Sequence, residues 1–270
     1  MSILPDSLAY MQRVQDAARL GYPWYVTGEL SLEKWPSLKI KLTELYDCNL
    51  PKSTRSKRRS SGEAVTLLYA VAGPPDQVPR MVRWLMAVSD GKGRVHAREK
   101  LLRFDSTDRC SFIGRYELVH DGVGWSWRMN RKRVEALRER IHEIAAAPPE
   151  HRQIRRDAGG DFDAEIESVM DELYHAPGFR LMRRQIGKLV SFAQGEWRRL
   201  RPESGPQIRP RTFLPYITRR ANSVKLRLDA GEARETQGCM RMQHVVCAYR
   251  MLHVVCCMRI HPVPRWLSFP

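Results

Sequence analysis

The sequence predicts an α+β protein, with an N-terminal mixed α/β domain that includes a β-hairpin and a basic helical C-terminal region. Three observations predict it. Apolar residues recur at helical spacing in several segments, short apolar runs are bounded by turn residues, and two aromatic strands flank a glycine-containing turn. With 270 residues, of which 43 % are hydrophobic and 28 % charged, the chain has the length and composition of a globular protein with a substantial core.

The first half of the chain alternates helices and strands, which favours a mixed domain. Leu32, Trp35, Leu38, Leu42 and Leu45 form an apolar stripe after Ser31, a partial N-cap. The predicted elements are a helix at 7–20, a strand at 22–30, a helix following Ser31, a buried strand at 64–72 and a helix at 78–88 that buries Val82, Leu85 and Met86.

The clearest local signal is the β-hairpin. Residues 116–120 and 125–129 are aromatic-rich and flank a turn at 121–124 that contains two glycines. Asn130 can then cap a helix at 131–147. Trp125, Trp127 and Met129 share one face of the second strand.

Two interpretations of that aromatic face are open. An exposed face would be a base-stacking platform of the kind found in single-strand binders. A buried face would be the aromatic core beneath the helix at 131–147, and we favour burial because a hairpin needs one covered face.

The second half is predicted to be helical. Ile166, Val169, Met170 and Leu173 form one helical stripe in an acidic stretch, and a second helix is expected at 179–200. Two helices joined by a short turn fit either a DNA-reading helix-turn-helix or an ordinary helical hairpin. The predicted organisation is a mixed α/β domain at 1–147, a linker at 148–162, a basic helical region at 163–230 and a repeat-containing tail at 231–270, for which disorder is one expectation.

Positive charge is the most informative chemical feature. The chain carries 46 Lys and Arg against 30 Asp and Glu, a formal net charge of +16, and residues 180–228 hold 13 Lys or Arg against two acids. Arginine can grip a phosphate with two hydrogen bonds, and clustered cations favour counterion release on nucleic acid. The segment 51–62, with five cations and no acid, is expected to be an exposed mobile loop. The candidate nucleic-acid contacts are Lys52, Arg55, Lys57, Arg58, Arg59, Arg180, Arg183, Arg184, Lys188, Arg198, Arg199 and Arg201.

Acidic residues suggest a second function. Asp161 and Asp163 are paired carboxylates that could hold Mg²⁺ in a nuclease or primase-like phosphoryl-transfer enzyme. Acids at the start of a helix are also what the helix dipole favours, and no second acidic cluster accompanies them. We therefore expect neither a catalytic metal nor a cofactor.

The tail contains a tandem nonapeptide. His244, Cys247, His253 and Cys256 are zinc-ligand types, but the two pairs are closer together than zinc ligand pairs usually are. A direct repeat in the coding DNA is the preferred explanation. The cysteine distribution does not predict a disulfide framework, and neither a signal peptide nor a membrane span is recognisable, so we expect a cytoplasmic protein.

Three stretches are familiar together: residues 25–30, the hairpin strands at 116–118 and 125–129, and residues 177–180. They resemble uncharacterised accessory proteins of proteobacterial plasmids and integrative conjugative elements, over roughly residues 22–220. The resemblance implies a mobile-element setting in which DNA is the natural polyanion, and it assigns no catalytic residue. The expected function is DNA binding in plasmid replication, its control or mobilisation. A protein-interaction module that binds an acidic partner remains an alternative.

Overall fold

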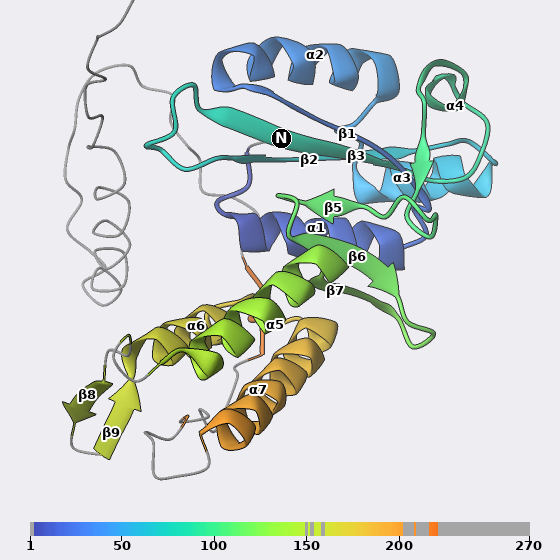
Figure 1. Ribbon diagram of the computed structural model, residues 1–270. Helices are drawn as coiled ribbons and strands as arrows, with labels where there is room; N and C mark the ends of the chain where they lie inside the picture. Colours follow the sequence, from blue (N-terminus) through green and yellow to red (C-terminus); the bar gives the residue numbers. More distant parts are fainter. Residues whose placement is uncertain are drawn as a thin grey trace, which may run out of the picture. The chain divides into compact units, whose positions relative to one another are not determined.

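In the computed structural model, a four-stranded antiparallel sheet organises the first half of the chain (Figure 1). The structure describes residues 3–148, 151, 154–157, 160–201, 208 and 216–220, and residues 1–226 form one compact unit. The strands lie in the order β2-β3-β1-β4 and comprise Trp24–Ser31 (β1), Thr66–Ala72 (β2), Met81–Val88 (β3) and Leu102–Arg103 (β4). The expected α+β class is confirmed.

The helices of this half precede the sheet or connect its strands. They are α1 (Ser7–Arg19), the short 3₁₀ helix η1 (Leu32–Lys34), α2 (Trp35–Tyr46), α3 (Lys52–Ser60) and α4 (Arg94–Arg98). Because β1 leads through α2 and α3 to β2, and β3 leads through α4 to β4, the connections are those of a split β-α-β unit.

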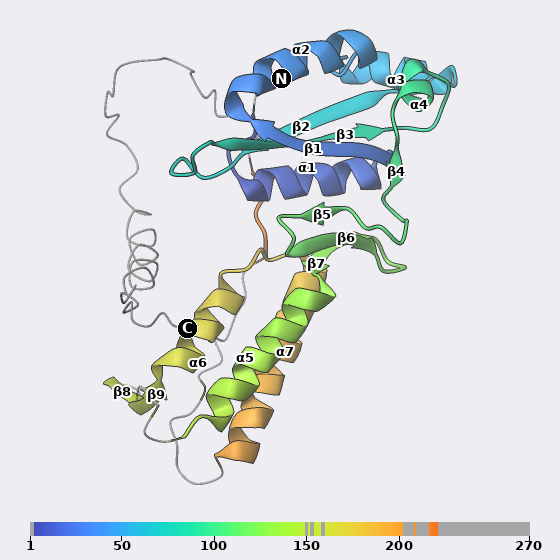
Figure 2. The ribbon, with the colours of Figure 1, turned by 45° about the horizontal axis from the view of Figure 1, so that its top comes forward.

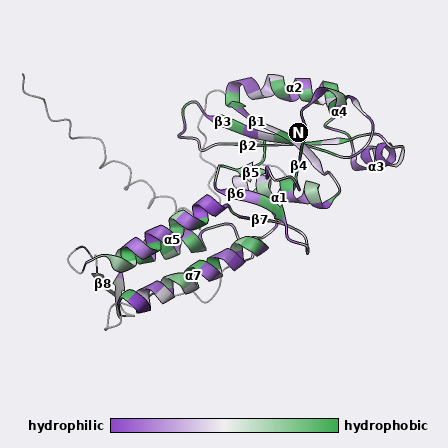
Figure 3. Ribbon diagram, turned by 45° about the vertical axis from the view of Figure 1, so that its right-hand side comes forward, coloured by the Kyte–Doolittle hydropathy of each residue, from purple (hydrophilic) through white to green (hydrophobic). Residues whose placement is uncertain are grey.

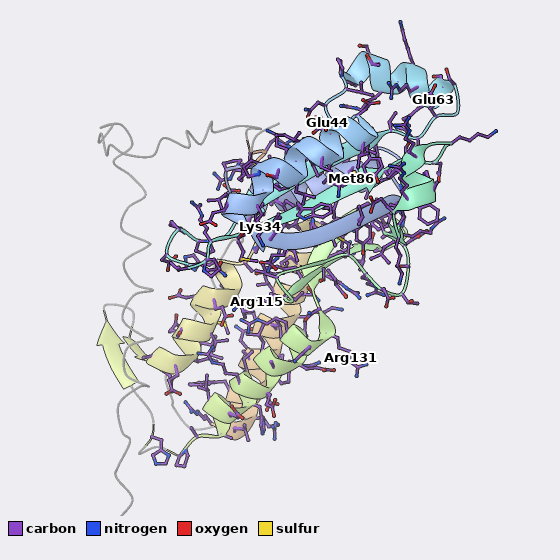
Figure 4. All side chains as sticks on the ribbon, turned by 90° about the horizontal axis from the view of Figure 1, so that it is seen from above. Lys34, Glu44, Glu63, Met86, Arg115 and Arg131 are labelled. Carbon is purple, nitrogen blue, oxygen red and sulfur yellow. The ribbon has the colours of Figure 1, made fainter. Side chains whose placement is uncertain are left out.

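Both faces of the sheet are covered. Helix α1 packs on the face that carries Tyr25, Leu67 and Leu85, and α2 packs on the opposite face (Figures 1 and 2). Met86, labelled in Figure 4, belongs to the core under α2. Successive side chains along each strand therefore pack into two separate cores, one on each face of the sheet.

The predicted helix at 78–88 is wrong, because Met81–Val88 forms strand β3 between β1 and β2. Val82, Leu85 and Met86 are buried as expected, but they divide between the two faces of the sheet. A strand that is covered on both sides is a continuous apolar run, and such a run does not differ from a buried helix in its periodicity.

The predicted hairpin is confirmed and belongs to a second, three-stranded sheet. Its strands are β5 (Ser111–Phe112), β6 (Tyr116–His120) and β7 (Trp125–Met129), in that order. Trp127 is fully buried and its Nε1 donates to the carbonyl oxygen of Met11, 2.8 Å away. The aromatic face is therefore part of the core, as expected. However, the Trp127 indole forms its hydrogen bond with α1 and not with the helix at 131–147, which we expected to cover this face.

Three helices follow the hairpin. They are α5 (Arg131–Ala146), α6 (Ala164–Tyr174) and α7 (Arg180–Leu200), with strands β8 (Ile154–Asp157) and β9 (Gly160–Asp163) in the segment expected to be a linker. The Asn130 side chain accepts a hydrogen bond from the Arg133 amide, so the predicted cap of α5 is confirmed. Helices α5 and α7 lie side by side and bury Leu137 and Ile141 of α5 with Ile186 and Ala193 of α7 (Figure 3).

Two further features concern the chemical environment of the chain. Within the described residues, none of the helices combines the length and the apolar character that crossing a membrane requires. Cys48 and Cys110 are buried free thiols. Burial raises the pKa of Cys48 to about 11 and that of Cys110 to about 12, so both thiols stay protonated at neutral pH.

Candidate nucleic-acid interface

The segment expected to be a mobile loop forms helix α3, so that prediction is wrong. Residues 52–60 contain neither glycine nor proline, and Pro51 precedes the first helical residue, where a proline does not interrupt the hydrogen bonds. Three cations occupy the last turn, where they meet the negative end of the helix dipole. The exposure of the segment is as expected, because α3 buries none of its side chains.

Arginine contacts attach α3 to the rest of the fold. The Arg59 guanidinium donates to the carbonyl oxygens of Leu20 and Gly21, at 3.0 and 3.1 Å, and lies 5.1 Å from the centroid of the Tyr22 ring. Arg58 Nη1 lies 2.8 Å from Asp47 Oδ2. These contacts fix the orientation of a helix that has no apolar face.

The lysines of α3 are arranged differently from its arginines. Lys52 and Lys57 are exposed, and within the described part of the chain neither forms an ion pair. Arg55 is half-buried and donates to the Leu50 carbonyl oxygen at 2.6 Å. The lysines therefore carry the charge that is free to meet a ligand, and Figure 3 shows α3 as a hydrophilic segment.

A second loop brings another cation next to α3. Lys92 is exposed, its amide donates to the Gly62 carbonyl oxygen at 2.8 Å, and its own carbonyl oxygen accepts from the Ala64 amide at 2.9 Å. Gly91, with φ +127°, makes this approach possible, because a Cβ there would lie 2.6 Å from the Ala64 nitrogen. These backbone hydrogen bonds make an isolated parallel β-bridge between Lys92 and Glu63, which is labelled in Figure 4.

Sequence reasoning missed two members of this surface. Arg19 is an exposed residue in the last turn of α1. It directly precedes Leu20 in the sequence, whose carbonyl oxygen accepts a hydrogen bond from Arg59. Lys92 is 32 residues from Ser60, the end of α3, and its only sequence signal is the Gly-Lys-Gly triplet of its turn. We define the α3 surface by these residues: Arg19, Lys52, Arg55, Lys57, Arg58, Arg59 and Lys92. The acids next to it, Asp47 and Glu63, both pair with Arg58.

Helix α7 carries the second predicted cluster, and part of it is accessible. The exposed residues on one side of the helix recur at intervals of three or four, which places them in a single stripe. We define the α7 face by these residues: Arg184, Gly187, Lys188, Ser191, Gly195 and Arg198. The face has three cations and no acid, and from Arg184 to Arg198 it spans roughly 21 Å.

Two other predicted contacts on α7 have partners within the protein. Arg180 binds Asp121 in the hairpin turn through two hydrogen bonds of 2.6 Å, and these bonds lower the pKa of that carboxyl group. Arg183 is half-buried, and its guanidinium carbon lies 3.4 Å from the centroid of the Tyr216 ring. Neither side chain belongs to the α7 face, because both are half-buried.

Two more arginines, at the end of α7, form ion pairs within the protein. Arg199 pairs with Glu196, and hydrogen bonds from Arg199 and His142 lower the pKa of Glu196 to about 2. Arg201 is buried, with its side chain 2 % exposed, and it pairs with Asp163, also 2 % exposed, at 3.2 Å. In this structure a phosphate cannot reach Arg201, because the surrounding core excludes solvent.

The predicted metal residues are placed only in part. Asp163 caps α6 through the amides of Glu165 and Ile166 and uses its second oxygen for Arg201, so its acceptor positions serve the fold. The Asp161 side chain and the histidine and cysteine residues of the tail lie outside the described residues. Over the described ranges, no group of three metal-ligating side chains comes together.

Comparisons with known proteins add no assignment: no protein-family model, no curated protein and no solved structure matches the chain.

Proposed function

We propose that the protein binds DNA through phosphate contacts from the α3 surface and the α7 face. The observation that carries the proposal is α3, a nine-residue helix with five cations, no acid and no buried side chain. An isolated helix of this length is unstable in water, and mutual repulsion of the cations weakens it further. Attachment of such a helix by arginine contacts is consistent with a role in presenting charge.

The charge of the whole chain supports a polyanionic ligand. A net charge of +16 raises the local concentration of phosphate groups and accelerates their encounter with the protein. The resemblance of residues 22–220 to accessory proteins of plasmids and conjugative elements makes mobile-element DNA the polyanion that we propose, in replication, its control or mobilisation. The cytoplasmic location expected from the sequence belongs to the same proposal.

The test is a series of binding curves on a fluorescein-labelled DNA duplex between 50 and 300 mM salt, in roughly the range where counterion release dominates. Fluorescence anisotropy gives Kd, and the slope of log Kd against log salt counts the phosphate contacts. We expect a steep slope for the natural protein. The double variant Lys52→Ala, Lys57→Ala should reduce the slope by about 1.8, because each lost contact contributes about 0.9.

The same relation predicts the loss of affinity. At 0.1 M salt, two lost contacts correspond to about a 60-fold higher Kd. The matched control is Lys34→Ala, Lys41→Ala on η1 and α2, which removes two exposed lysines outside both surfaces and should raise Kd much less. A Kd that is flat across the salt series, or an equal loss in both double variants, would overturn the proposal. A natural protein that binds no DNA would favour the acidic protein partner.

A further inference from the structure

The hairpin turn between β6 and β7 presents an apolar side chain next to the α7 face. Val123 is 81 % exposed, and it stands between Gly122 and Gly124. A Cβ added at either glycine would meet no atom within 4 Å. The tip of the turn is therefore narrow and stands clear of its surroundings.

The turn is held in one conformation. Asp121 Oδ1 accepts hydrogen bonds from the amides of Val123 and Gly124, at 3.3 and 3.1 Å. Gly122 has a φ of +85°, a left-handed conformation that glycine adopts without strain. An exposed valine on a turn with these internal bonds has a fixed direction, so the turn itself would lose little conformational entropy on binding a partner.

The position of the turn next to α7 is also fixed. Arg180, at the start of α7, binds both oxygens of Asp121 and donates to the Gly124 carbonyl oxygen at 3.3 Å. Arg184 Nη1, the first cation of the α7 face, lies 3.7 Å from Asp121 Oδ2. The apolar tip and the row of cations are thus neighbours joined by a shared ion-pair network.

We propose that the Val123 tip enters the minor groove of double-stranded DNA while the α7 face contacts the adjacent phosphates. The inference rests on the proposed DNA-binding function and names the form of DNA and the element that reaches its bases. The minor groove is about 6 Å wide, and proteins that insert an apolar side chain there unstack a base step and bend the duplex. A valine between two glycines is narrow enough for this groove, and the neighbouring cations would hold the backbone beside it.

The experiment measures the bend separately from affinity. A duplex of about 30 base pairs carries a donor dye at one end and an acceptor dye at the other. Bending brings the two ends closer and raises the energy transfer between the dyes at saturating protein. Apolar side chains inserted in the minor groove typically kink the duplex by about 20–90°. We expect the natural protein to raise the energy transfer between the two dyes above that of the free duplex. The Val123→Ser variant should bind with a similar salt slope and a Kd within about tenfold, but it should lose most of the rise in transfer.

The matched control is Val78→Ser, which changes a valine that is 92 % exposed in the connection between β2 and β3. This variant should bend the duplex as the natural protein does, and thermal melts of both variants should match that of the natural protein. Binding without a rise in transfer, an equal bend from Val123→Ser, or binding confined to single strands would overturn the groove insertion and leave the proposed function standing. Absence of DNA binding by the natural protein would overturn both.

Discussion

Replacement of Arg201 by methionine tests whether the buried ion pair at the end of α7 serves the fold. The Arg201 guanidinium bonds Asp163 Oδ2 at 3.2 Å and the carbonyl oxygens of Ile144 and Ala145 at 2.5 and 3.0 Å. Methionine has a similar length but donates no hydrogen bond. The substitution leaves the Asp163 charge buried without its guanidinium partner and removes a donor from two carbonyl oxygens at the end of α5.

The expected loss is about 3–5 kcal/mol of unfolding free energy, the range measured when one partner of a buried ion pair is removed. In urea unfolding followed by circular dichroism, this loss lowers the midpoint by roughly 1–2 M for an m value of about 2–3 kcal/mol per M. The matched control is Arg198→Met, three residues earlier and exposed, which should change stability by less than about 0.5 kcal/mol.

The two variants should also separate in DNA binding. At a temperature where both are folded, Arg198→Met should reduce the salt slope by about 0.9, whereas Arg201→Met should leave it unchanged. The reasoning is refuted if Arg201→Met keeps the full unfolding free energy and reduces the salt slope. That result would make Arg201 a phosphate contact, as its place in the basic stretch suggested.

Two further predictions concern buried groups. Trp127→Phe should cost about 1–3 kcal/mol, because it removes the indole donor to the Met11 carbonyl oxygen and puts a smaller ring in a solvent-free core; an unchanged urea midpoint would contradict this. The unfolding free energy should fall as pH rises above about 9, because the unfolded chain then loses thiol protons that folding retains on Cys48 and Cys110. Urea titrations from pH 8 to 10, in a variant with the four tail cysteines changed to serine, measure this fall, and a flat or rising profile would contradict it; buried tyrosines such as Tyr10, whose pKa is also raised, add to the fall near pH 10.

The features that the sequence predicted correctly depend on local chemistry. The hairpin strands are found at residues 116–120 and 125–129, because two glycines mark their turn and the aromatic residues mark their length. The cap of α5 was predictable because the Asn130 side chain and the Arg133 amide are three residues apart. Interactions of this range are visible in a single stretch of sequence.

Two of the errors in the fold have long-range causes. Strand β3 is apolar on both faces because α1 and α2 cover the sheet from opposite sides, and neither helix is near it in sequence. Helix α3 depends on contacts of Arg59 with residues 20–22 and of Arg58 with Asp47. Its composition shows only that it is exposed, since propensity and capping are weak signals in a segment without an apolar face.

The candidate site shows why a count of charges overestimates an interface. Residues 180–201 contain seven of the predicted nucleic-acid contacts, but the structure uses Arg180, Arg199 and Arg201 to bind Asp121, Glu196 and Asp163. Asp121 and Asp163 are 59 and 38 residues from their partners in the sequence, whereas Glu196 is three residues from Arg199.

The chemistry of arginine and lysine explains which cations of α3 remain free. Arginine presents a planar fork of donors that matches a carboxylate or a pair of carbonyl oxygens. Arg58, Arg59 and Arg201 accordingly donate to acceptors on other segments of the chain. Lysine is a hydrated point charge on a flexible stem, and Lys52 and Lys57 stay in solvent. If the protein binds DNA, Lys52 and Lys57 should therefore contribute more to the salt slope than Arg58 and Arg59 of the same helix.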